Sequence, residues 1–65
     1  MRKVSTGVEG LIGQTGEALE DLNPKGKVFV NGEYWMAEAA VKIPEGASVR
    51  VTSVRGMILA VEIDR

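Results

Sequence analysis

The chain has 65 residues, enough for one small domain close to the lower size at which a core sustains itself. It contains no cysteine and no histidine, which excludes disulfides, thiolate metal sites, and the most common metal ligand and general base. Eight basic and nine acidic residues are mixed along the chain and leave a net charge of −1, so a phosphate backbone is not an obvious partner.

Residues 1–12 are expected to be an N-terminal lead-in or tether, because they are polar and contain glycine without helical periodicity. The barrel domain is predicted over residues 13–65, where turn signals recur at the spacing typical of a small β sandwich or barrel. A first extended segment is expected from Gly13 to Leu22. It ends at Asn23–Gly26, where proline in second and glycine in fourth place predict a type I turn.

A β-hairpin follows, with Asn31-Gly32 as a two-residue type I′ turn between Lys27–Val30 and Glu33–Ala37. This turn fixes the register, so that Phe29 pairs with Tyr34 and Val28 with Trp35. Because side chains alternate along a strand, one face of the hairpin is expected to join the core. The core face carries Val28, Val30, Trp35 and Ala37, with Trp35 as its predicted keystone, and the opposite face carries Lys27, Phe29, Tyr34, Met36 and Glu38.

Two further strands are predicted, Ala47–Val54 and Met57–Ile63, separated by Arg55-Gly56 and preceded by the Ile43–Gly46 turn signal. Val54 breaks the alternation of the preceding valines, which predicts a β-bulge within Thr52–Val54. Five short strands with two exposed edges would invite aggregation, so we expect an all-β fold that closes into a barrel.

Catalytic, cofactor and metal sites are not indicated by any motif. The acidic residues, such as Glu17, Glu20 and Asp21, fit solvated strand faces and loop tips, because the filled interior of so small a barrel offers no cleft. No histidine is present to activate a serine, and no lysine-serine pair follows a glycine cluster as in a P-loop. Gly13 and Gly16 are expected to allow a curved first strand or a close strand crossing.

Phe29, Tyr34 and Met36 form the candidate partner surface, since aromatic residues and methionine are enriched in interface cores. The alternative is that the first strand or the N-terminal segment covers these side chains. The alternative function is single-stranded nucleic-acid binding, in which Phe29 and Tyr34 would form a stacking platform beside Lys27, Arg50 and Arg55. The net charge disfavours nucleic acid, and a purely structural cap without a partner is a third possibility.

The ordered run of signals from Gly13 to Val61 resembles the C-terminal soluble domain of the NfeD family. The most specific piece is Gly32–Ala37, which reads G-E-x-W-x-A and follows a P-x-G turn. The other matching segments are Gly13–Ala18, Leu22–Val28, Ile43–Val51 and Val54–Val61.

The resemblance implies a five-stranded Greek-key OB-fold barrel without catalytic residues of its own. It also implies a parent protein in which membrane-spanning helices, and sometimes a serine protease domain, precede this domain. The implied partner is a stomatin-like (SPFH) membrane protein, with self-association as a further possibility, and the expected location is the cytoplasmic side of the membrane. The longest apolar runs of the chain itself, such as Met57–Val61, are far shorter than the ~20 residues of a membrane helix.

Overall fold

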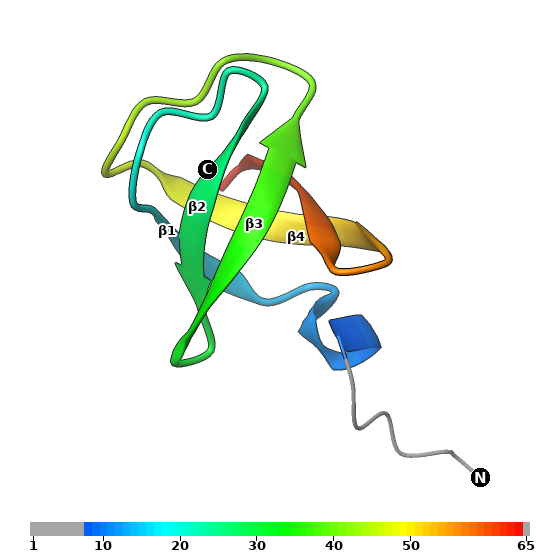
Figure 1. Cartoon of the computed structure of the whole chain (residues 1–65). Helices are drawn as coiled ribbons and strands as arrows, with labels where there is room; N and C mark the ends of the chain where they lie inside the picture. The colour runs from blue at the N-terminus through cyan, green and yellow to red at the C-terminus, as the bar shows by residue number, and fades with distance from the viewer. Residues whose placement is uncertain (1–7, 65) are drawn as a thin grey trace, which may run out of the picture.

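The computed structural model describes residues 8–64, which form a closed barrel of five strands (Figure 1). The elements are the short 3-10 helix η1 (Val8–Leu11), β1 (Thr15–Ala18), β2 (Lys25–Val30), β3 (Glu33–Ala39), β4 (Ser48–Arg55) and β5 (Ile58–Ile63). Around the barrel the order is β1-β2-β3-β5-β4, and β4 closes against β1. Only β3 and β5 run parallel. This order confirms the predicted all-β, five-stranded Greek-key barrel of the OB type.

The β2–β3 hairpin has the predicted register, with Phe29 opposite Tyr34 and Val28 opposite Trp35. Asn31 and Gly32 have φ angles of 53° and 81°, and two positive φ angles in succession are what a type I′ turn requires. In Figure 1 the tip of this hairpin lies at the end of the barrel opposite the long loop between β3 and β4. The hairpin is therefore specified locally and presents a fixed outer face.

Strand alternation builds the core as predicted. Valines and alanines of β2 and β3 face inward opposite Val49 and Val51 of β4 and Leu59 and Val61 of β5. The predicted bulge in β4 is confirmed, because the β4–β5 register shifts between Val51 and Ser53. The largest fully buried side chains are Leu22, Ile43 and Leu59.

Trp35 was expected on the core face as the keystone of the core; the face is right, but the role as keystone is wrong. Its side chain is on the core face but only partly buried, and it packs against the core from outside the buried cluster. The reason is its position along β3, because pairing with β5 begins only at Met36 and Trp35 therefore lies where the barrel ends. The narrow interior is filled by aliphatic side chains instead.

The predicted boundaries are wrong at two places near the start of the barrel. β1 is confined to Thr15–Ala18, because the chain bends after Ala18 and Leu22 pairs with Ile43 in an isolated bridge. The predicted type I turn over Asn23–Gly26 is replaced by the start of β2 at Lys25. Contact with β3 sets this start, since the Ala39 amide donates to the carbonyl oxygen of Pro24 over 2.9 Å.

The end of the predicted lead-in contributes to the barrel. Leu11, in η1, is only 5% exposed and belongs to the core cluster. The following residues reach β4, where the Gly13 amide donates to the Val51 carbonyl and the Val51 amide to the Gln14 carbonyl, both over 2.9 Å. Residues 1–7 lie outside the described part of the chain.

β1 and β2 approach each other closely at Gly16, which pairs with Val30 of β2 and with Val49 of β4. A Cβ atom added at Gly16 would overlap the Phe29 carbonyl oxygen and lie 2.6 Å from a Val30 methyl group. Only glycine allows this close approach between the two paired strands.

Candidate functional site

Phe29, Tyr34 and Met36 lie together on the outer face of the β2–β3 hairpin, and we call these three residues the hairpin surface. Their exposed fractions are 38%, 69% and 45%. The rings of Phe29 and Tyr34 are 5.2 Å apart between centroids and inclined at 57°, a favourable tilted arrangement. β1 pairs edge to edge with β2 through Glu17 and Phe29, so it lies beside the hairpin surface and does not cover it.

Met57 extends this apolar region from the turn between β4 and β5. It is 69% exposed and lines an open hollow of about 560 Å³. The residues around the hollow are Gly32, Glu33, Tyr34, Trp35, Met36 and Met57. Sequence reasoning missed Met57 because it reads as the first residue of an apolar strand. The signal available in the sequence was the preceding glycine, Gly56, which favours a turn. In the structure Gly56 has a φ of 63°, and Met57 belongs to the same exposed turn.

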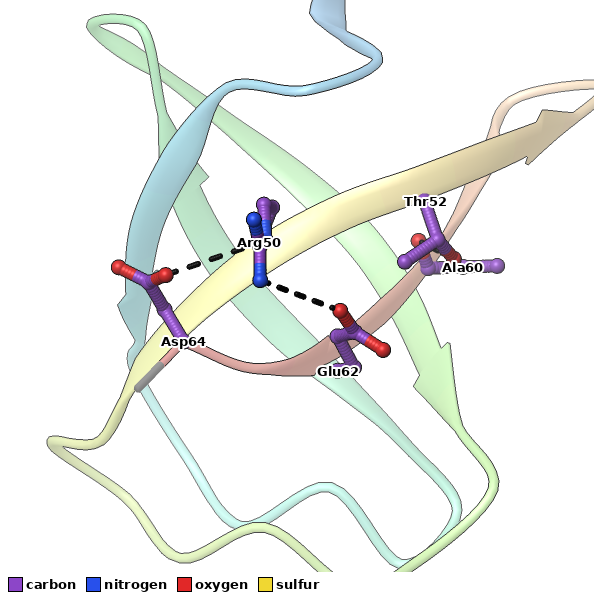
Figure 2. Close-up of polar contacts among 5 residues, drawn as sticks. All are labelled: Arg50, Thr52, Ala60, Glu62 and Asp64. Carbon is purple, nitrogen blue, oxygen red and sulfur yellow. Dashed lines mark hydrogen bonds and ion pairs between the residues drawn. The ribbon is translucent and has the colours of Figure 1, made fainter.

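The nucleic-acid alternative depends on three cations, Lys27, Arg50 and Arg55. The Lys27 ammonium is 6.0 Å from the centroid of the Tyr34 ring, at the limit of a cation–π contact. A guanidinium nitrogen of Arg50 lies 3.4 Å from a carboxylate oxygen of Glu62, and another lies 3.9 Å from one of Asp64. Figure 2 draws both ion pairs as dashed lines. A guanidinium nitrogen of Arg55 lies 3.6 Å from a carboxylate oxygen of Glu38. Carboxylates therefore partner both arginines that the nucleic-acid alternative would use.

Two of the acidic side chains in the loop after β1 have structural roles. Glu20 Oε2 accepts a hydrogen bond of 2.8 Å from the backbone amide of Lys27, and Asp21 Oδ1 accepts one of 2.8 Å from that of Glu45. Both contacts fix neighbouring loops and strand ends. Within residues 8–64, the acidic side chains form no group of three or more that could hold a metal ion.

No helix in the part of the chain that the structure describes is both long and apolar enough to cross a membrane.

A family model described as "NfeD-like C-terminal, partner-binding domain" matches residues 8–62, which is most of the chain. Among curated proteins, the chain is 41% identical over 98% of its length to a membrane-bound protease of Pyrococcus horikoshii, of which the match covers 15%. It is 30% identical over 94% of its length to an uncharacterized protein of Methanocaldococcus jannaschii, of which the match covers 46%. The chain thus spans less than half the length of these curated relatives.

Two solved structures have the same fold. The C-terminal domain of a stomatin operon partner protein from Pyrococcus horikoshii superposes with a TM-score of 0.85 at 41% identity, covering 94% of this chain and 98% of that one. The soluble domain of a membrane protein implicated in regulation of membrane protease activity, from Corynebacterium glutamicum, gives 0.80 at 28% identity. That match covers 86% of this chain and 95% of the other.

Proposed function

Because this chain belongs to the family of NfeD-like C-terminal, partner-binding domains, we propose that it is a non-catalytic protein-interaction module that binds its partner through the hairpin surface. The observation that carries this proposal is the exposure of Phe29, Tyr34 and Met36 side by side on one rigid hairpin. Contiguous exposed apolar groups of this kind mark protein-binding sites more often than ordinary surface.

The residue types support the same function. Aromatic residues and methionine are enriched in the cores of protein interfaces, where charged residues are depleted. Tyr34 and Met57, each 69% exposed, would lose apolar surface to a partner without any rearrangement of the barrel. The paired backbone of β2 and β3 holds Phe29 and Tyr34 in place, so little conformational entropy would be lost on binding.

The proposed partner is a stomatin-like (SPFH) membrane protein. A relative with 41% identity is the C-terminal domain of a stomatin operon partner protein, and the chain covers 98% of that domain. We further propose that the barrel is held near a membrane, on its cytoplasmic side, as part of a membrane-anchored protein. Any protease chemistry of such a protein would then lie outside this barrel, which would supply the partner contact.

The test is a double substitution, Phe29→Ser with Tyr34→Ser, measured by calorimetric titration against a stomatin-like protein from the same genome. Binding should weaken by about 1–2 kcal/mol or more, as expected when interface anchors are removed. The barrel should stay folded, since exposed strand positions change stability only modestly. Thermal unfolding followed by circular dichroism checks this.

Val41→Ser is the matched control, because Val41 is 61% exposed and lies in the β3–β4 loop, away from the hairpin tip. It should leave the affinity unchanged. A folded double variant that binds as tightly as the wild type would reject the hairpin surface as the binding site. Binding of a single-stranded oligonucleotide with steep salt dependence would favour the nucleic-acid alternative instead.

A further inference from the structure

Among residues 8–64, the first half of β3 has a neighbouring strand on one side only. β2 pairs with β3 from Glu33 to Glu38, whereas β5 joins it only from Met36 onward. The segment Glu33–Trp35 therefore forms an open edge of the sheet, and this edge lies along the hollow beside the hairpin surface.

The hairpin geometry shows which backbone groups this edge presents. A two-residue turn makes Val30 and Glu33 a hydrogen-bonded pair, so the next pair, Phe29 and Tyr34, is a non-hydrogen-bonded one. The N–H and C=O groups of Tyr34 must then point away from β2, toward the open side. Among residues 8–64, no backbone hydrogen bond outside the strand ladders involves Tyr34.

Other strand ends of the barrel are closed by specific contacts. Glu20 accepts from the Lys27 amide in the first half of β2, and Pro24 accepts from the Ala39 amide at the end of β3. Gly13 and Gln14 exchange hydrogen bonds with Val51 in β4. Natural sheets cover or disrupt their edges to prevent unwanted pairing, so an edge left open beside an apolar surface suggests a strand supplied by another molecule.

The hollow also indicates the chemistry of the strand that would fit. Tyr34, Met36 and Met57 provide apolar contacts, and Glu33 is the one charged residue among those that line it. Among the described residues, no ion pair involves Glu33. The site thus combines a backbone donor and acceptor, an apolar wall and a single negative charge.

We propose that an extended segment of the protein partner pairs with the backbone of Tyr34 as an added strand, with aliphatic side chains against Met36 and Met57 and a lysine or arginine beside Glu33. This inference rests on the proposed function and specifies how the partner binds. In strand addition the main-chain hydrogen bonds give affinity and the alternate side chains give specificity. A helix could contact the apolar wall, but it could not satisfy the Tyr34 backbone groups.

The probes are overlapping twelve-residue peptides that together cover the stomatin-like protein, tested beside the intact protein. Amide hydrogen exchange measured by NMR should be rapid at Tyr34 and slow at Trp35 in the free chain. At least one peptide that contains a basic residue should slow exchange at Tyr34, and so should the intact partner. Glu33→Gln should weaken binding of that peptide, and added salt should remove the difference.

Replacing the Tyr34 amide by an ester, through chemical synthesis of the chain, removes the donor and keeps the side chain. The affinity should fall about three- to tenfold, the effect of one hydrogen bond. The same replacement at Val41 should change nothing. If the intact partner binds while the Tyr34 amide stays unprotected, or the ester binds equally well, strand addition is rejected and the proposed function stands. If neither the partner nor any peptide binds, both are rejected.

Discussion

Replacing Leu59 by alanine is expected to leave the chain largely unfolded at room temperature. Leu59, the second residue of β5, is completely buried and lies opposite Ala37 of β3 and Val54 of β4. Truncating a buried leucine costs about 2–5 kcal/mol through lost transfer free energy and the cavity that remains. A core of this size supplies only about 3–5 kcal/mol in total, so the loss is comparable to the whole stability. Urea unfolding monitored by tryptophan fluorescence measures the free energy of unfolding of the variant and of the wild type.

Met57→Ala is the control for this experiment, because Met57 is 69% exposed in the turn before β5. The free energy of unfolding of the Met57→Ala variant should remain within about 0.5 kcal/mol of the wild-type value, as for most surface substitutions. A Leu59→Ala variant with a cooperative transition near that of the wild type would contradict the assignment of Leu59 to the core.

Gly16→Ala is expected to destabilise the barrel by about 3 kcal/mol, the upper end of the range for overpacked sites. The new Cβ atom would meet the carbonyl oxygen of Phe29, and a backbone atom within a paired strand cannot move aside as a flexible side chain can. Relief would require β1 to separate from β2, which would loosen the closure of the barrel. The thermal midpoint should fall sharply relative to the wild type.

Thr15→Ala tests the same strand at the adjacent, exposed position and should change the midpoint little. If Gly16→Ala were as stable as Thr15→Ala, the close approach of β1 to β2 at Gly16 would not hold in solution.

The parts of the fold that sequence reasoning predicted are those that local rules determine. Asn31-Gly32 fixes both the turn type and the register of β2 and β3, because few other residues adopt two positive φ angles in succession. The exposure of Phe29, Tyr34 and Met36 follows from that register and from strand alternation. Whether another segment covers this outer face stayed open at the level of the sequence, and the exposed fractions in the structure answer it for the described residues. The role of these side chains in binding remains a prediction.

The features that sequence reasoning missed depend on contacts between distant segments. Whether Trp35 is central or peripheral depends on where β5 begins beside β3, which no pattern within either strand specifies. Leu11 is one of several apolar residues in a segment without clear periodicity, and only its contact with the barrel identifies it as core. Among the described residues, the same relation between β3 and β5 leaves the edge at Tyr34 open, so the proposal of an added strand needed the structure.

Binding through the hairpin surface is the central claim, and methyl NMR of the intact chain with the stomatin-like partner tests it most directly. With labelled methionine and valine methyl groups, addition of the partner should shift or broaden the signals of Met36 and Met57, which border the hairpin and its hollow. The signals of Val41, which is exposed on the β3–β4 loop, should stay in place. Perturbation of Val41 with unchanged Met36 and Met57 signals would contradict the claim.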